Sequence, residues 1–290
     1  MKGIILAWGS WTRLYPITMA ISKQLMPIYD KPMIYYPLTT LMLAGIREIL
    51  IITTPHDKAA FERLLGDGSA WWLSLVYKVQ DAPEWLPQAF VLAEDFLDGD
   101  SACLILWDNL FYGQWFSRLL QETKRKVEET GNSYIFWYAV SDPERSWVVE
   151  FDAEMNVLSI EEKPKTPKSN YAIPGLYFYT GDAPKIARGL KKSERWEYEI
   201  VDMHLAYLRE SRLKVELFNR GYAWLDTGTH ASMIDAANFI KIVQDRQWLQ
   251  VGSPEEVAYR MWWIDANQVR SLAEPMKKNG YGQYLLNLIK

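Results

Sequence analysis

Two aspartates that each end an apolar segment are the strongest candidates for chemistry in this chain. Asp108 comes just after the run at 102–106 (ACLIL), and Asp226 ends the segment at 223–226 (AWLD). Because parallel strands present their ligand site at their carboxyl ends, two carboxylates there can hold Mg²⁺ against a triphosphate. A helix N-cap explains either aspartate alone equally well, and only the pair favours a metal site.

The loop after the first apolar segment is a candidate phosphate site. It reads Trp8-Gly9-Ser10-Trp11-Thr12-Arg13, so backbone N–H groups precede a guanidinium, an arrangement that suits a phosphate ligand. Gly9 is its only glycine, however, and on this spacing alone an ordinary turn with a surface arginine is the simpler interpretation. Lys23 follows in a segment that ends at Pro27, and by itself it indicates no more than a solvated lysine.

Two further charged segments could bind a phosphorylated sugar. In Glu161-Glu162-Lys163-Pro164 the lysine follows an expected strand, and the proline restricts the backbone beside it, which fixes a point charge. A charged hairpin loop explains this segment equally well. The acids of Arg195-Trp196-Glu197-Tyr198-Glu199 could bind sugar hydroxyls or simply begin a helix.

Several other chemistries are excluded by residue type and spacing. His56, His204 and His230 have no metal-ligand spacing, and Cys103 is the only cysteine, so a zinc site is not expected. No G-x-S-x-G segment supports a serine nucleophile. A single cysteine cannot form an internal disulfide, which favours a reducing, cytoplasmic location.

The composition describes an ordinary globular chain with one anomaly. The 290 residues carry a net charge of -4, which gives no reason to expect a nucleic acid partner, and no apolar window is long enough to cross a membrane. Hydrophobic residues make up 49% and charged residues 23%, which excludes a disordered chain. The anomaly is 14 tryptophans against 16 glycines.

The elements that must position these side chains form an α/β pattern. Apolar, β-branched runs alternate with amphipathic stretches, which predicts a Rossmann-like, doubly wound, mixed and largely parallel sheet with helices on both faces. We expect strands at 3–7, 49–53, 75–79, 102–106, 133–140, 147–151, 157–161, 173–179 and 213–218, and helices at 34–44, 61–65, 87–96, 116–129, 232–248, 254–262 and 265–277. We expect residues 1–229 to form the α/β core with a sugar-binding β region, and 230–290 to be a helical portion packed on it as one structural unit.

Taken together, the segments resemble the sugar-phosphate nucleotidyltransferase family over essentially the whole chain. Such long matches in the same order are specific. The matching segments are 22–38 (SKQLMPIYDKPMIYYPL), 41–47 (LMLAGIR), 64–69 (LLGDGS), 161–164 (EEKP), 167–171 (PKSNY), 175–179 (GLYFY) and 220–230 (RGYAWLDTGTH).

The resemblance implies a reaction in which dTTP and glucose 1-phosphate give dTDP-glucose and pyrophosphate. Such phosphoryl chemistry depends on positioning and charge neutralisation. By resemblance, the catalytic residues are Arg13, Lys23 and Lys163, and the Mg²⁺ ligands are Asp108 and Asp226. The nucleotide would contact Trp8, Gly9, Ser10, Trp11, Thr12, Gln80, Trp85 and Asp108, and the sugar would contact Asn109, Trp147, Glu162, Lys163, Tyr177 and Glu197. The resemblance further implies a homotetramer inhibited by dTDP-rhamnose, the end product of the pathway, at an interface site that includes Arg260.

The chain departs from the family in one consistent way, because tryptophan stands where relatives carry glycine. Only Trp71, Trp224 and Trp263 stand where an aromatic residue is expected. The other eleven are Trp8, Trp11, Trp72, Trp85, Trp107, Trp115, Trp137, Trp147, Trp196, Trp248 and Trp262. Indoles at positions 8 and 11 would fill the space of a triphosphate or push the loop away from it.

Random drift does not replace one residue type by one other type so consistently. Our hypothesis is that UGA codons read as glycine in the source organism have been written as tryptophan; a deliberately engineered series is the other origin. If the tryptophans are real, the chain is a catalytically silent nucleotide- or sugar-binding homologue. Within the active interpretation, a UTP- or CTP-using enzyme is the alternative, since base choice depends on few contacts near Gln80 and position 85.

Overall fold

The computed structural model describes residues 1–8, 14–81, 86–152, 157–192 and 198–290, and its centre is a mixed β-sheet. One half of the sheet is parallel. In it β1 (Lys2–Ala7) lies between β6 (Ala102–Leu106) and β4 (Glu48–Thr53), and β5 (Ser74–Val79) follows β4. These are the apolar runs that the sequence predicts as strands.

The other half of the sheet is largely antiparallel and continues from β6. Here β12 (Leu176–Tyr179) joins β6 to β8 (Ser133–Ala139), and β11 (Tyr171–Ala172), β9 (Trp147–Phe151) and β10 (Val157–Glu162) extend the sheet. β13 (Leu213–Phe218) pairs with β8 in parallel.

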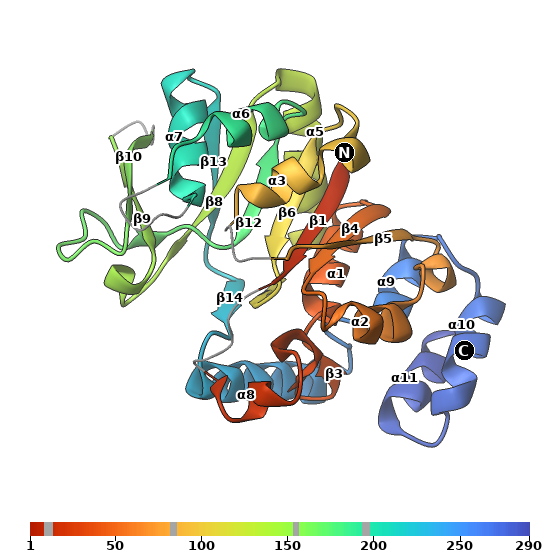
Figure 1. Cartoon of the computed structure of the whole chain (residues 1–290). Coiled ribbons are helices and arrows are strands. Elements are labelled where there is room, and N and C mark those ends of the chain that lie inside the picture. Colours follow the sequence, from red (N-terminus) through yellow and green to blue (C-terminus); the bar gives the residue numbers. More distant parts are fainter. Residues whose placement is uncertain (9–13, 82–85, 153–156, 193–197) are drawn as a thin grey trace.

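Helices cover both faces of the sheet, and alternate strand residues show why (Figure 1). Ile5, Ile49 and Ile51 pack in one hydrophobic cluster, whereas their neighbours Ile4 and Leu50 pack in another. The cluster of Ile5 includes residues of four helices: α1 (Tyr35–Leu43), α2 (Lys58–Leu65), α5 (Phe116–Thr130) and α9 (Pro254–Arg260). The cluster of Ile4 includes residues of four others: α3 (Gln88–Leu92), α4 (Glu94–Leu97), α6 (Ala183–Gly189) and α7 (Ile200–Arg209). The doubly wound fold is therefore confirmed.

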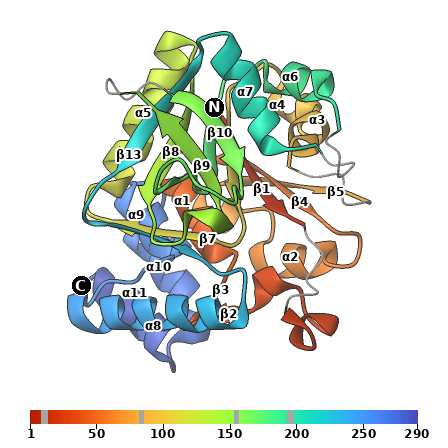
Figure 2. The ribbon, with the colours of Figure 1, turned by 90° about the vertical axis from the view of Figure 1, so that its left-hand side faces the viewer.

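Two small ribbons and a long helix complete the region next to the ends of β1 and β6. β7 (Asn109–Gly113) pairs with β14 (Tyr222–Asp226), and β2 (Pro27–Ile28) pairs with β3 (Lys31–Pro32). α8 (His230–Gln247) packs against β14 and β2. Both views place α8 beside β3 at the end of the molecule that also holds α10 (Ala266–Ala273) and α11 (Gly280–Leu288) (Figures 1 and 2).

The C-terminal helices share the core of the sheet. Val269 of α10 and Leu285 of α11 belong to the same hydrophobic cluster as Ile5. The division at residue 229 stays a prediction, although these contacts fit its single structural unit. None of the described helices combines the length and apolar composition that a membrane span needs.

The structure corrects several expected element boundaries. The expected helix at 87–96 is two short helices that meet at Ala93, and the expected strand at 173–179 begins only at Leu176. Pro174 has no N–H to donate to a strand ladder, which accounts for the later start. Among the described residues, the longer elements that the sequence analysis did not predict are β7, β14, α6, α7 and α11.

Candidate active site

The ribbon of β7 and β14 brings the two candidate metal ligands together. Asp108 lies between β6 and β7, and the register of the ribbon sets Asp226 opposite Asn109. Thr227 fixes this arrangement, since its N–H and its hydroxyl donate to the carbonyl of Asp108 at 3.0 and 3.1 Å. Asp108, Asn109 and Asp226 line one pocket of about 170 Å³.

Asn109 holds the floor of this pocket with both ends of its amide. Its Oδ1 accepts a hydrogen bond from the N–H of Gly175 at 2.9 Å and another from the indole N–H of Trp224 at 2.6 Å. Its Nδ2 donates to Asp108 Oδ1 at 3.0 Å. Asn109 is 4% exposed, so each of these bonds replaces one to water. The amide therefore orients the Asp108 carboxylate.

Lys23 lies on the opposite side of Asp108. Its Nζ is 3.7 Å from Asp108 Oδ2 and 4.0 Å from the centre of the Trp107 ring, and the residue is buried. A buried ammonium beside a carboxylate is a strong local source of positive charge for a phosphate. The structure thus joins Lys23 and Asp108, which the sequence predicts separately.

Tyr177 on β12 is buried near Asp108 but does not line its pocket. The residue is fully buried, and its Oη has no hydrogen-bond partner among the described residues. Burial and then the neighbouring Asp108 charge raise the pKa of the phenol far above its usual value. The hydroxyl therefore stays protonated, and it can donate to an oxygen of a bound ligand.

Gln80, the predicted base-reading residue, follows β5 and is buried. Its Nε2 donates to Gln88 Oε1, and its carbonyl accepts from the indole N–H of Trp8 at 2.9 Å. The Trp8 indole consequently lies against the position where the base edge is expected. Gln88 gave no signal in the sequence analysis.

The pair of strands β9 and β10 carries three of the predicted sugar-side residues, with Trp147 on β9, Glu162 on β10 and Lys163 directly after it. Trp147 lines the pocket of Asp108, and Glu162 lies opposite Trp147 in the ladder. Lys163 has a φ of 42°, a left-handed conformation that costs about 1–3 kcal/mol for a non-glycine residue and often marks a functional site. Its Nζ is 3.3 Å from Glu162 Oε1.

Glu162 also borders a second, larger pocket of about 760 Å³. Glu199, Asp202 and Arg209 line this pocket with it. Partial burial raises the pKa of Asp202, Arg209 opposes this rise, and Glu162 adds to it. The sequence pointed to the segment at 195–199 and gave no separate signal for Asp202.

Seven predicted site residues lie outside the described part of the chain. They are Gly9, Ser10, Trp11, Thr12, Arg13, Trp85 and Glu197. Arg260, the predicted effector residue, is on α9, where its Nε donates to Glu256 Oε1 at 2.6 Å.

The donor set suits a magnesium ion that also binds substrate. Among the described residues no cluster of three or more His, Cys, Asp or Glu side chains could form a complete protein cage. Two carboxylates, Asp108 and Asp226, do face one pocket. Mg²⁺ is commonly held by one or two carboxylates, with phosphates and water as its other ligands. The residues present therefore fit this ion.

A doubly wound sheet with paired carboxylates at its strand ends, and a buried lysine beside one of them, is typical of a protein that binds a ligand at this edge of the sheet. A sequence model of the nucleotidyl transferase family matches residues 2–242. Glucose-1-phosphate thymidylyltransferases of Mycobacterium tuberculosis and Neisseria meningitidis are 56% and 53% identical to the chain, covering all of it and 99% and 100% of their own lengths. The chain therefore belongs to the nucleotidyl transferase family, and these relatives place it among its glucose-1-phosphate thymidylyltransferases.

Solved structures agree with this assignment. A glucose-1-phosphate thymidylyltransferase of Bacillus anthracis, solved in complex with sucrose, superposes with a TM-score of 0.75 at 36% identity, over 82% of this chain and 94% of that one. A UDP-glucose pyrophosphorylase complexed with UDP-glucose has a TM-score of 0.70 at 23% identity, over 84% of this chain and 99% of that one, and it shows the shared fold alone.

Proposed function

We propose that the enzyme transfers a thymidylyl group from dTTP to glucose 1-phosphate, giving dTDP-glucose and pyrophosphate. The observation that carries the proposal is that Asp108 and Asp226 line one pocket, with Lys23 Nζ 3.7 Å from Asp108 Oδ2, in a chain whose full-length relatives are thymidylyltransferases. The reaction joins two anions, so the site must neutralise charge and align an oxygen with a phosphorus.

The predicted catalytic residues have the following parts in that reaction. Lys23, with Arg13, neutralises the triphosphate and the departing pyrophosphate, and Lys163 holds the sugar phosphate for in-line attack on the α-phosphorus. Asn109 keeps the Asp108 carboxylate turned toward the pocket. A magnesium ion held by Asp108 and Asp226 would supply further charge neutralisation at the phosphates.

The glucose is recognised on the side of the antiparallel sheet. Tyr177 offers a buried hydroxyl donor, and the carboxylates of Glu162 and Glu197 accept from sugar hydroxyls. Asn109 and Trp147 border the same space. The nucleotide would lie along the 8–12 loop, with Gln80 and residue 85 at its base.

One observation favours a second candidate, a silent binding protein on this fold. The Trp8 indole is bonded to the Gln80 carbonyl, next to the expected base position. A tryptophan truly present at positions 8 and 11 would block the nucleotide, and only the glycine form would be active. A UTP- or CTP-using transferase is the alternative for the active form, and competition between dTTP, UTP and CTP separates these possibilities.

We further propose a cytoplasmic homotetramer regulated at a subunit interface that includes Arg260. The Arg260–Glu256 pair lies on α9, which packs on α1 and α10 rather than in the pocket of Asp108. Cys103 is buried, which suits a reducing compartment. Sedimentation with and without dTDP-rhamnose tests the assembly and its effector.

The experiment that tests the reaction is pyrophosphate release with dTTP, glucose 1-phosphate and Mg²⁺. The protein should carry glycine at all eleven tryptophan positions that the family resemblance assigns to glycine, 8 and 11 among them, with the chain as written measured beside it. We expect activity in the glycine form and little or none in the chain as written. An Asp226→Asn variant of the glycine form should lose activity, because Asp226 is one of the two proposed magnesium ligands.

A further inference from the structure

We propose that Trp72, Trp115, Trp248 and Trp262 are glycines in the protein that its own cell makes, and that their codons are UGA read as glycine. The inference rests on backbone conformation and does not depend on the proposed reaction. The φ angles of these four residues are 61°, 64°, 58° and 59°. For a bulky side chain a positive φ is a genuine outlier, whereas glycine adopts it freely.

Tryptophans with a positive φ are far more frequent than the abundance of tryptophan in the chain predicts. Among the described residues eight non-glycine residues have a positive φ, and four of them are tryptophan. Tryptophan makes up only 14 of the 290 residues. The other four are Tyr29, Asp98, Lys163 and Ser211.

The four residues stand at helix ends, where glycine has a known role. Trp248 ends α8, and its N–H donates to the Gln244 carbonyl at 3.0 Å, which is the hydrogen bond of a left-handed C-cap. Trp72 ends a short helical turn at 69–71, and Trp262 follows α9, each with an N–H bond to the third residue before it. Trp115 precedes α5 as its N-cap. Glycine is the residue that helices most often use at the left-handed C-terminal position.

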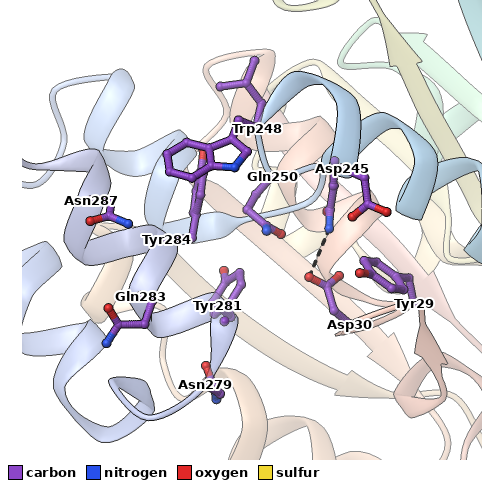
Figure 3. A pocket seen from close by; sticks show the side chains of 13 residues that line it. Tyr29, Asp30, Asp245, Trp248, Gln250, Asn279, Tyr281, Gln283, Tyr284 and Asn287 are labelled. Carbon is purple, nitrogen blue, oxygen red and sulfur yellow. Dashed lines mark hydrogen bonds between the residues drawn. The ribbon is translucent and has the colours of Figure 1, made fainter.

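The indoles of these four residues add no core packing that would compensate the strain. Trp72, Trp115, Trp248 and Trp262 are 54%, 69%, 76% and 88% exposed, and none belongs to the hydrophobic clusters of the described residues. Trp72 does meet the Arg47 guanidinium, 4.2 Å from the ring centre, but such an exposed contact contributes only about 0.5–1 kcal/mol. Figure 3 shows the Trp248 indole at a pocket of about 690 Å³ that Gln250 and Tyr284 also line.

Two adjacent pairs provide an internal comparison. Trp71 is 5% exposed and meets the Tyr35 ring edge-on at 6.0 Å, while its neighbour Trp72 is left-handed and exposed. Trp263 packs against the core cluster, while its neighbour Trp262 is left-handed and exposed. One residue of each pair is thus a normal core tryptophan, and the other has a left-handed backbone conformation that is typical of glycine. A single written residue type therefore stands for two different amino acids.

Two tryptophans at glycine-like positions also border the active site. Trp107 lies over Lys23, and Trp147 lines the pocket of Asp108. That pocket holds about 170 Å³, below the ~300–1,000 Å³ typical of ligand sites. Glycine at position 147 would enlarge it, and glycine at position 107 would free the face of the Lys23 ammonium.

The test is to read the gene and sequence peptides of the protein purified from its source organism by mass spectrometry. We expect UGG then UGA at codons 71 and 72, UGA then UGG at codons 262 and 263, and UGA at 115 and 248. The peptides should carry glycine in place of Trp72 and Trp262, each beside an unchanged tryptophan at Trp71 and Trp263. Trp224 is the control and should be UGG and tryptophan.

Two results would overturn the inference: UGG codons at these four positions, or UGA codons with tryptophan in the native peptides. A recombinant comparison adds a readout without the native source. Trp262→Gly should raise the Tm, because it relieves strain, and Trp263→Gly should lower it, because it removes core packing. Equal losses in both variants would contradict the assignment.

Discussion

The bonds of Asn109 lead to a quantitative prediction about the pocket floor. In Asn109→Ala the buried N–H of Gly175 and the part-buried indole N–H of Trp224 lose the acceptor that they share. An unsatisfied buried donor costs about 1–3 kcal/mol, and the part-buried indole should lie at the lower end, so the free energy of unfolding should fall by roughly 2–5 kcal/mol. The loss should appear as a lower urea midpoint with an unchanged m-value.

A double-mutant cycle isolates the proposed cause. Trp224→Phe removes the indole N–H itself, so residue 224 has no donor left without a partner. This variant should lower the free energy of unfolding by only about 0.5–1.5 kcal/mol. The double variant has no orphaned indole, so its loss should be smaller than the sum of the two single losses by about 1 kcal/mol or more. Asn267→Ala, on the more exposed face of α10, is the matched control, with a change within about 0.5 kcal/mol. Additive losses, or an Asn109→Ala protein as stable as the control, would refute the reasoning.

Three further predictions concern the metal, the ribbon and pH. Asp108→Asn and Asp226→Asn should each weaken Mg²⁺ binding at least ~10–100-fold, because losses of that size occur even when a group that only hydrogen-bonds to a metal ligand is removed. The Mg²⁺ dependence of pyrophosphate release measures this affinity. Gly113→Ala should destabilise the β7–β14 ribbon by about 1–3 kcal/mol, because the added Cβ would lie 2.2 Å from the Tyr222 ring. Gly189→Ala is the control and should not destabilise the protein, because its Cβ would meet no atom within 4 Å. Burial lowers the pKa of His204 to about 3, so its contribution to stability is complete above pH 6.5 and falls by about 1.4 kcal/mol per unit as pH drops toward about 3. Urea unfolding at several pH values should show a shallower decline for His204→Phe.

The parallel half of the fold follows from the sequence because its strands are buried on both faces. The runs 49–52 and 102–106 are continuously apolar, as is typical of strands covered on both sides, and they lie in β4 and β6. Asp108 could be placed at a strand end for the same reason. α6 and α7 carry weaker patterns and were missed, and the ribbon of β7 and β14 joins segments more than a hundred residues apart, which local periodicity cannot predict.

The site could be predicted only in its parts. The contact between Lys23 and Asp108 depends on the path of the chain between β1 and α1. Only the family resemblance, and no feature of the two residues themselves, indicated that they belong to one site. The amide of Asn109 was expected to contact sugar, and the structure shows it engaged with Asp108, Gly175 and Trp224. Its role toward sugar stays a prediction. Gly175 and Thr227 gave no chemical signal, because each acts through a backbone group.

The most direct test of the proposed function is product formation by the chain with glycine at the eleven tryptophan positions assigned to glycine, 8 and 11 among them. With dTTP, glucose 1-phosphate and Mg²⁺, mass spectrometry should detect dTDP-glucose and pyrophosphate in equal amounts. EDTA should abolish both, and UTP and CTP should compete poorly with dTTP. A folded glycine form that binds dTTP but makes no dTDP-glucose would contradict the account.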